Sequence, residues 1–371
     1  MCIRDRISAG ILAINLARKK SNRNFYLVCL AVAIAILTIY KFQSGEFSQV
    51  ISLETAKQLP EFYYKGRSDF FLDNPFAFWL TARRSGFFPY EWQYFLLCLA
   101  ILWLPGLIWK SCKFKTTRIS QSQIEIIWQI LMASLGLFIL SHLLLFKLHL
   151  PSRYSQHTWR IVIALSLGIM VALYLRNIWK KVTYLPQITK FLSLAIAICL
   201  LLYPTYAVQS RPYRLGYVNG DNPELYQFLQ QQPQDSLIAT TSKEGDFIPS
   251  LAQRSILIAR EYSIPYHWDF YQQIRLRTQD LIQAQYSEDP LEVNQFIQKY
   301  DFDFWLLDQN AFSEEYLSNN FWLKQFTTQT NKALSILKQE KTPAITSKIE
   351  QCRVFQTKEL TLLDAQCIMR N

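Results

Sequence analysis

The sequence predicts an α-helical transmembrane bundle of about five spans, followed by an extracytoplasmic α/β domain with a small mixed sheet. Three observations support this fold class. Half of the 371 residues are apolar and 15% are aromatic, yet the mean hydropathy is only +0.04. Residues 208–371 carry 16 Lys and Arg against 20 Asp and Glu, whereas residues 1–207 carry 23 against 8. The mean hydropathy of the whole chain therefore averages over a basic, apolar first part and an acidic second part.

Apolar runs bracketed by Tyr and Trp are the candidate spans, because these two residues prefer the headgroup level of a bilayer. A spanning helix needs about 20 residues, so the shorter runs depend on their aromatic ends to reach both surfaces. This bracketing disfavours the alternative, buried helices of a large soluble protein. The five runs are Phe25–Tyr40, Tyr94–Trp109, Ile126–Phe146, Ile161–Leu175 and Phe191–Val208.

Basic residues in the connections predict the orientation. Segments 18–23, 110–118 and 176–190 are rich in Lys and Arg and poor in acids, which is typical of cytoplasmic loops. The N-terminus is then cytoplasmic, and we expect loop 41–93, turn 147–160 and the C-terminal domain to lie outside. Because the predicted cytoplasmic loops account for the positive charge, no nucleic-acid partner is predicted. The expected location is a bacterial plasma (inner) membrane, with the C-terminal domain periplasmic.

The predicted domains follow these boundaries. Residues 1–24 form a cytoplasmic N-terminal segment, residues 25–208 the transmembrane region, and residues 209–371 the extracytoplasmic domain. The run Ile7–Ala17 is too short to span and is not followed by a signal-peptide cleavage site. We expect it to be the tail of an upstream helix, so that the chain is the C-terminal portion of a longer protein.

The second part alternates short apolar runs with helix signals, which predicts an α/β domain. Asn222-Pro223 and Asp289-Pro290 each combine a cap with a proline suited to the first turn. Cys352–Gln356 and Ala365–Met369 are expected to form an edge hairpin. The remaining predicted elements are strands Ser236–Thr240, Ile256–Ala259 and Phe302–Leu307 and helices from Asn222, over Ile264–Ala284 and over Leu291–Tyr300.

Cys352 and Cys367 are the two cysteines of the predicted external domain. A disulfide between them would close a loop of about 15 residues and contribute about 3 kcal/mol in the chain-entropy model. A bridge and a pair of free thiols are equally compatible with the sequence.

Cationic side chains in the two outer segments are the candidate substrate-binding residues, because Arg pairs with phosphate in bidentate geometry. The functional interpretation is recognition of a lipid-linked phosphate. The structural alternatives are arginines that reach bulk lipid phosphate, and a loop that merely packs over the helices. The candidates are Arg83 and Arg84 in the aromatic loop 41–93, and Arg153, Tyr154, His157 and Arg160 in the segment Leu148–Arg160.

A second polar segment, Ala252–Arg277, follows a predicted strand. Its Glu261-Tyr262 pair stands where ligands often meet an α/β sheet, whereas its Arg, Glu and Asp residues equally suit ion pairs that hold a domain together, the interpretation we favour. Tyr271 and Arg275 lie one helical turn apart in this segment.

The sequence lacks the phosphate-loop, dinucleotide, nucleophile-elbow and zinc-protease motifs, and it has no C-x-x-C pair. Ten glycines leave little material for a backbone phosphate cradle. Three of the four histidines lie near the predicted outer surface of the membrane. Histidines scattered along such an interface are commoner than histidines that bind one metal ion together. No cofactor is predicted, and a divalent metal ion is left open.

The order of these parts resembles bacterial polytopic membrane glycosyltransferases of the GT-C type. The resemblance rests on the outward Pro151-Ser-Arg-Tyr154 turn and on the stretch Pro223–Asp308, with Asp235-Ser-Leu-Ile-Ala, Arg254-Ser-Ile-Leu-Ile-Ala and Tyr300-Asp-Phe-Asp-Phe-Trp-Leu-Leu-Asp308. It covers about half of the chain, and the layout also resembles uncharacterised bacterial membrane proteins, for which no activity is implied.

The resemblance implies transfer of a sugar from a polyprenyl-phosphate donor on the extracytoplasmic face, with the bilayer and this lipid as partners. Such enzymes use an acid of the first external loop as the base. The spacing of the acidic residues in loop 41–93 does not single out one of them as this base, so no catalytic residue is assigned. The alternative function is that of a non-catalytic membrane protein whose external domain binds a partner or polymer. The acids of loop 41–93 are Glu46, Glu54, Glu61, Asp69 and Asp73.

Overall fold

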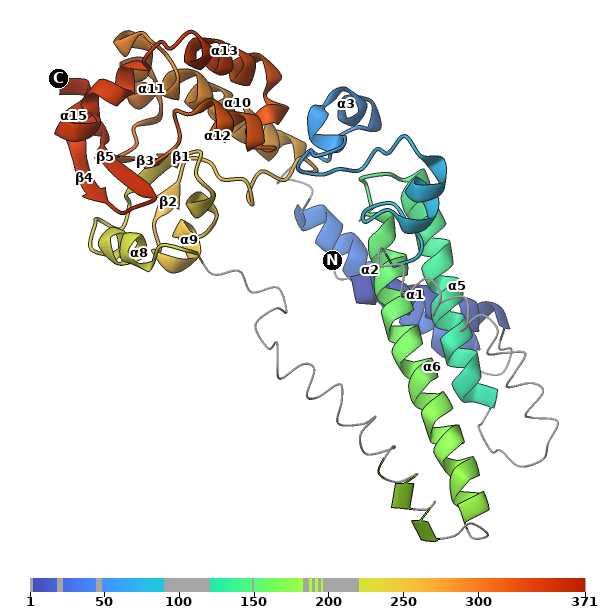
Figure 1. Cartoon of the computed structure of the whole chain (residues 1–371). Coiled ribbons are helices and arrows are strands. Elements are labelled where there is room, and N and C mark those ends of the chain that lie inside the picture. Colours follow the sequence, from blue (N-terminus) through green and yellow to red (C-terminus); the bar gives the residue numbers. More distant parts are fainter. Residues whose placement is uncertain are drawn as a thin grey trace. The chain divides into compact units, whose positions relative to one another are not determined.

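The computed structural model describes residues 3–18, 23–44, 49–89, 121–148, 150–182, 187–188, 191–192, 195 and 220–370. The chain forms two compact units, shown in Figure 1 with colours that follow the sequence. Unit 1 comprises Met1–Lys41 and Asp73–Val218, and unit 2 comprises Phe42–Leu72 and Asn219–Asn371. The predicted external loop 41–93 is therefore divided between the two units, with the boundary after Leu72.

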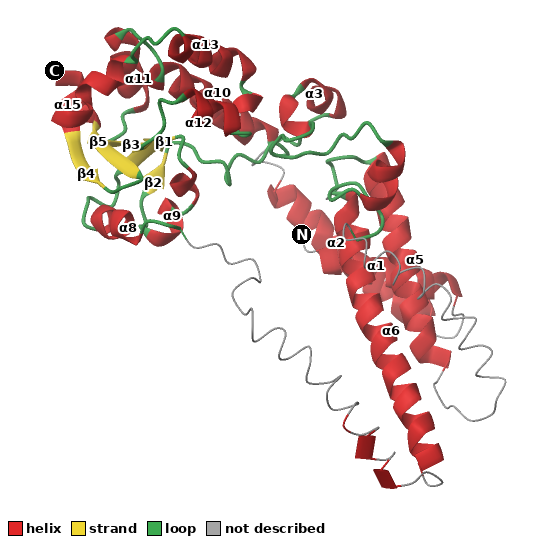
Figure 2. Ribbon diagram, viewed as in Figure 1, coloured by secondary structure: helices red, strands yellow, loops and turns green. Residues whose placement is uncertain are grey.

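Unit 1 is helical in its described residues (Figure 2). Helices α5 and α6 pack through an apolar cluster that contains Leu131 of α5 and Trp159, Val162 and Ile163 of α6. The Ser134 hydroxyl of α5 donates to the Tyr154 carbonyl of α6 over 2.7 Å. The helices described in this unit are α1 (Ile3–Arg18), α2 (Arg23–Ser44), the π-helix η2 (Ala77–Thr81), α5 (Gln121–Leu143) and α6 (Pro151–Val182).

The predicted bundle of five transmembrane spans is wrong for the part of the chain that the structure describes. There, one helical segment, Ile126–Leu143, is both long and apolar enough to cross a membrane, and the apolar part of α2, Arg23–Ile36, is shorter. Phe25–Tyr40 and Ile161–Leu175 hold 16 and 15 residues in the sequence, fewer than the roughly 20 that a span needs, and the side chains of residues 169–175 lie outside the described ones. The run Tyr94–Trp109 and most of Phe191–Val208 lie outside the described residues.

The predicted outward turn Leu148–Arg160 is mostly helical. Helix α5 ends at Leu143, turns follow, and α6 begins at Pro151. Proline suits the first helical position, where its missing N–H would have no partner in any case. The candidate residues from Arg153 to Arg160 therefore lie on the first turns of α6.

Unit 2 contains a five-stranded mixed sheet of strand order β2-β1-β3-β5-β4. The small mixed sheet predicted from the sequence is thus present. Strands β2, β1 and β3 are parallel, and β5 runs antiparallel to both β3 and β4. The strands are β1 (Leu237–Thr240), β2 (Ser255–Ile256), β3 (Phe304–Asp308), β4 (Arg353–Gln356) and β5 (Leu360–Asp364).

Helices cover both faces of this sheet (Figure 2), because β3 is apolar on both sides. Phe304 and Leu306 join the core formed with α8 and α9, while Trp305 and Leu307 join the core formed with α10 and α11. This alternation is the period of two that a strand imposes. The helices named here are α8 (Pro223–Gln230), α9 (Ile248–Leu251), α10 (Trp268–Gln285) and α11 (Pro290–Tyr300).

Shorter helical segments complete unit 2. Before the sheet lie α3 (Leu53–Gln58) and η1 (Pro60–Phe62), and η4 (Lys243–Asp246) follows β1. After β3 come α12 (Glu314–Asn319), η5 (Leu323–Gln325), α13 (Thr327–Lys338), η6 (Ala344–Lys348), α14 (Ile349–Cys352) and, at the end of the chain, α15 (Ala365–Arg370).

The two Pro-led helices begin as predicted, but they are capped differently. The Asp289 side chain accepts from the Leu291 amide at the start of α11. Asn222 precedes α8 without a side-chain cap bond, and its Oδ1 lies 3.5 Å from the Thr357 hydroxyl. Asn222 therefore joins α8 to the β4–β5 turn.

The predicted hairpin is correct in its first strand and wrong in its second. Strand β4 pairs with Leu360–Asp364, whereas the apolar run Ala365–Met369 belongs to α15. The Asp364 carboxylate accepts from the Cys367 amide over 2.7 Å and so helps to begin this last helix. Ala365 and Ile368 are buried three residues apart, which is a helical spacing.

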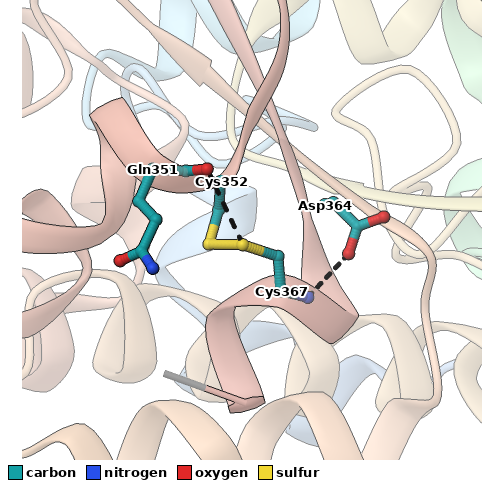
Figure 3. The surroundings of a disulfide bond; sticks show 4 residues. All are labelled: Gln351, Cys352, Asp364 and Cys367. Carbon is teal, nitrogen blue, oxygen red and sulfur yellow. Dashed lines mark hydrogen bonds between the residues drawn. A yellow bond between two sulfur atoms is a disulfide. The ribbon is translucent and has the colours of Figure 1, made fainter.

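Cys352, at the end of α14, and Cys367, in α15, are joined by a disulfide (Figure 3). The bridge ties the helical turn that precedes the edge strand β4 to the helix that follows β5. It therefore holds the last segment of the chain against the sheet.

Candidate functional site

The basic candidates of unit 1 lie on the first turns of α6. Arg153, His157 and Arg160 are all exposed, and at spacings of four and seven residues they share one side of the helix. Nη1 of Arg153 lies 3.3 Å from Nε2 of His157. We call these three residues the basic ridge.

Arg83 and Arg84 are held at the start of the same helix through their backbone. The Ser152 hydroxyl donates to the Arg83 carbonyl over 2.9 Å, and the Ser152 amide donates to the Arg84 carbonyl over 3.2 Å. The Gln156 side chain adds a 2.8 Å bond to the Ala82 carbonyl. The structure thus places the backbone of the exposed Arg83 and of the half-buried Arg84 against Ser152, the residue before Arg153.

Tyr154 is placed differently from the other candidates. Its side chain is fully buried, and its hydroxyl accepts a hydrogen bond from the Arg6 guanidinium of α1. Its carbonyl accepts from Ser134 and Thr158. Tyr154 therefore packs the helices of unit 1 together and has no surface left for a ligand.

The charges of the basic ridge are not neutralised by the described residues. None of Arg83, Arg153 and Arg160 forms an ion pair with a carboxylate in the described part of the chain. Partial burial, followed by the charges of Arg153 and Arg160, lowers the pKa of His157 below its usual value. His157 is therefore neutral near pH 7 and contributes a hydrogen-bonding ring between two cations.

The histidines do not assemble a metal centre in the described residues. His142 packs its ring 4.4 Å from that of Trp79, and its Nε2 lies 3.1 Å from the Ser85 carbonyl. His149 lies outside the described residues. In the described ranges, no group of three His, Cys, Asp or Glu side chains has the geometry of a metal site.

In unit 2 the segment 49–72 is tied to the α/β domain, which agrees with the structural interpretation of the polar residues there. Oε1 of Glu61 accepts from the Tyr271 hydroxyl over 2.7 Å and from Nε of Arg275 over 2.8 Å. The Glu61 side chain is fully buried, and its Oε2 has no hydrogen-bond partner among the described residues. Burial, followed by the charge of Glu61, raises the pKa of Tyr271, which keeps this phenol a donor.

Further bonds fix the same segment at both ends. Arg67 forms an ion pair of 3.1 Å with Glu261 and donates to the Arg260 carbonyl. The Ile51 amide donates to the Tyr266 carbonyl over 3.1 Å. Segment 49–72 is therefore an integral part of unit 2, and Glu61 is occupied by structural contacts.

The other acids of the loop are placed less distinctively. Glu54 is exposed in the first turn of α3, Asp73 is exposed, and Asp69 is half-buried. Glu46 lies outside the described residues. The geometry does not select one of them as a catalytic base.

The carboxyl ends of β1 and β3 meet in a polar cluster that the sequence reasoning missed. The Ser242 hydroxyl donates to Oδ1 of Asp308, and the Tyr316 hydroxyl donates to Oδ2, both over 2.6 Å. Burial raises the pKa of Asp308, with Glu244 and Glu359 adding to the rise and the two hydroxyl donors opposing it. The available signal was a Ser and an Asp at the ends of neighbouring parallel strands, where ligands of open α/β sheets bind.

A cleft of about 760 Å³ lies close by, between the start of α8 and the β4–β5 turn. Asp221 connects the two regions, because its amide donates to Oε1 of Glu244 in η4. The Tyr226 hydroxyl donates to the other oxygen of Glu244. The lining residues of the cleft are Asp221, Asn222, Pro223, Glu224, Gln356, Thr357, Lys358 and Glu359.

Three polar regions are thus defined: the basic ridge of unit 1, and the Glu61 tie and the Asp308 cluster of unit 2. Glu61 and Asp308 are engaged by hydrogen-bond donors, whereas Arg153 and Arg160 are exposed and form no ion pair with a carboxylate in the described part of the chain. The basic ridge is the region best suited to bind a ligand. No protein-family model matches the chain, and no curated protein matches it.

Proposed function

We propose that this chain is a membrane protein that binds the phosphate of a polyprenyl-linked sugar through Arg153 and Arg160, as part of sugar transfer outside the cytoplasm. The observation that carries the proposal is the pair of exposed arginines on α6, which have no carboxylate partner in the described residues. An anionic ligand would supply the missing charge.

The level of these arginines relative to α5 supports a lipid ligand. Arg153 adjoins Tyr154, whose carbonyl accepts from Ser134, and Ser134 lies within the apolar segment Ile126–Leu143. If this segment crosses a bilayer, Arg153 lies beside a membrane helix, and its ionised side chain there requires an anionic partner. A phosphate on a lipid chain combines the required charge with an apolar tail.

Three groups suit the phosphate. The guanidinium of Arg binds phosphate oxygens in bidentate geometry and remains ionised at all relevant pH values. The ridge also begins within the first turn of α6, where the helix dipole favours an anion. The His157 ring, whose pKa is lowered by burial and by the two arginines in the chain without ligand, can add a hydrogen bond to the phosphate.

The disulfide between Cys352 and Cys367 supports an extracytoplasmic position for unit 2, because disulfides persist mainly in oxidising compartments. In the proposed reaction the bond between the sugar's anomeric carbon and the phosphate oxygen breaks. A bond to the acceptor hydroxyl oxygen forms, and the hydroxyl proton passes to a base.

The test is binding of a sugar-linked polyprenyl phosphate to the full chain in lipid nanodiscs. Arg153→Gln combined with Arg160→Gln is expected to weaken binding at least tenfold. The matched control is Lys147→Gln, because Lys147 is also exposed and basic but lies in the turn after α5. Unchanged binding in the double variant, or equal loss in the control, contradicts the proposal.

Bulk lipid phosphate is distinguished by competition. Excess phosphatidylglycerol should displace the probe only weakly if the ridge selects the polyprenyl phosphate. Displacement at equal concentrations would instead mean that the arginines merely contact the bilayer, the structural alternative for snorkelling side chains.

The second candidate is a non-catalytic membrane protein whose external domain binds a partner or polymer. The observation that favours it is the engagement of Glu61 by Tyr271 and Arg275, which removes one loop acid from the candidates for the base. Sugar transfer measured with Glu54→Gln and Asp73→Asn separates the two functions. Loss of transfer in either variant supports the enzyme, and absence of transfer in the unmodified chain supports the binding protein.

A further inference from the structure

A group of aromatic and lysine side chains comes together on unit 2 from two distant parts of the chain. Nζ of Lys65 lies 5.3 Å from the ring centroid of Tyr64 and 4.7 Å from that of Phe321. Nζ of Lys324 lies 5.9 Å from the Phe321 centroid. We call Tyr64, Lys65, Phe321 and Lys324 the aromatic–lysine patch.

The patch is exposed although half of it is aromatic. Tyr64 retains 75% and Phe321 retains 48% of its accessible surface, and both lysines are exposed. Tyr63 next to it is 40% exposed. A contiguous exposed group of this kind marks an interaction surface more often than single exposed apolar residues do.

The backbone presents the patch in a fixed arrangement. The Arg67 amide donates to Oε1 of the buried Gln325 over 3.1 Å, which joins the two segments beside Lys65 and Lys324. Lys65 has a φ of 67°, and a Cβ at Gly66 would lie 2.4 Å from the Glu61 carbonyl oxygen. This tight turn lets the chain project Tyr64 and Lys65 outward.

The charge of the patch differs from that of its surroundings. Unit 2, residues 42–72 and 219–371, has a net charge of −7, since it carries 17 Lys and Arg against 24 Asp and Glu. Within the described residues, neither Lys65 nor Lys324 forms an ion pair with a carboxylate. The patch therefore offers two positive charges on an acidic domain.

This combination fits the surface of an anionic bilayer. Tyrosine and other aromatic rings settle at the headgroup level, and lysine side chains are attracted to the negative potential of an anionic surface. A neutral glycan would stack on the rings but would leave both ammonium groups without a counter-charge. An acidic protein would meet the charges, but the small exposed aromatic group offers it little area to bury.

We infer that the aromatic–lysine patch is a peripheral contact of unit 2 with the anionic headgroups of a phospholipid bilayer. It is separate from the basic ridge and does not depend on the binding of a polyprenyl phosphate. Its role is to bring the α/β domain to a membrane surface that carries negative charge.

Lysine footprinting with a membrane-impermeant amine reagent tests the inference on the full chain. The chain is placed in nanodiscs of phosphatidylcholine alone or of phosphatidylcholine and phosphatidylglycerol in equal parts. Labelling of Lys65 and Lys324 is expected to fall severalfold with the anionic lipid. The internal controls are Lys338 and Lys358, which are exposed in the same unit and should label equally in both discs.

Variants sharpen the assignment. Tyr64→Ser combined with Phe321→Ser should restore labelling of the two lysines, with binding at the ridge retained. Equal labelling of Lys65 and Lys324 in both discs overturns the inference, as does equal protection of the control lysines. Protection that requires an added acidic protein also overturns it and assigns the patch to a protein partner.

Discussion

Glu61 and Tyr271 are joined by a hydrogen bond of 2.7 Å between buried side chains, although 210 residues separate them in the sequence. Arg275, one turn further along α10, donates to the same carboxylate oxygen. One oxygen of Glu61 thus accepts two donors that help to hold segment 49–72, and the contribution of each donor can be tested by removing it.

Tyr271→Phe is predicted to loosen segment 49–72. The change removes a donor to a buried carboxylate, which typically costs about 1–3 kcal/mol. Trypsin cleavage after Lys57, Lys65 and Arg67 should accelerate at least fivefold. Phe270→Leu on the same helix, where Phe270 is 51% exposed, is the control and should leave the rate unchanged. Equal rates in Tyr271→Phe and the unmodified chain would show that the bond does not hold the segment.

Asp308→Asn is predicted to change how stability depends on pH. The folded pKa of Asp308 is raised by burial, so the folded state binds its proton more tightly than the unfolded state, whose pKa is near 3.9. The stability contributed by Asp308 is therefore present in acid and declines as the pH rises through the folded pKa. The Asn side chain does not titrate.

The unfolding free energy of the unmodified chain minus that of Asp308→Asn should thus become smaller from pH 4 to pH 7, measured by urea unfolding. Asp235→Asn, the same substitution at an exposed position of unit 2, is the control. A difference that grows with pH would mean that the Ser242 and Tyr316 hydroxyls outweigh the effect of burial.

Replacing Cys352 and Cys367 together by alanine is predicted to destabilise unit 2 by about 3 kcal/mol, the value expected for a closed loop of this length. Reduction of the unmodified chain should lower its unfolding temperature by as many degrees as the double substitution does. Cys29, a free cysteine in α2, serves as the control as Cys29→Ala. If a reductant lowers the unfolding temperature of the double variant as strongly as that of the unmodified chain, the disulfide does not account for the stabilisation.

Asp301→Gly is predicted to stabilise unit 2 by about 0.5–1 kcal/mol. Asp301 ends α11 at φ 45° and ψ 55°, a left-handed conformation that glycine adopts without steric strain. Asp301→Ala removes the same carboxylate but keeps a Cβ, so it should not stabilise. Equal effects of the two changes, measured as unfolding temperature, would point to the charge of Asp301 instead of its backbone.

Local signals predicted much of unit 2. The strands around Ile238 and Trp305 and the helix starts at Pro223 and Pro290 follow from apolar runs and from capping residues, which act over a few positions. The hairpin was misplaced at Ala365 because a short apolar run is compatible with either a strand or a helix, and the deciding contact is the Asp364–Cys367 bond.

The contacts that define the candidate sites were harder to predict. The bond from Tyr271 to Glu61 requires the chain to return over a long distance, and five acids in loop 41–93 look alike in sequence. Tyr154 resembles an interfacial aromatic until Arg6 is seen to donate to it. The Ser242–Asp308 pair depends on β1 and β3 being neighbours, which strand order fixes and local pattern does not.

The two edges of the sheet have a consequence for how the protein behaves at high concentration. Exposed strand edges are templates for pairing with other chains, and natural proteins protect them with short strands and irregularities. Edge strand β2 has two residues, and the other edge, β4, has a register shift between Arg353 and Phe355. The disulfide at Cys352 fixes the helical turn directly before this edge strand, and we expect it to help to preserve the irregularity. Reduction would therefore expose unit 2 to sheet-mediated aggregation before it abolishes the fold.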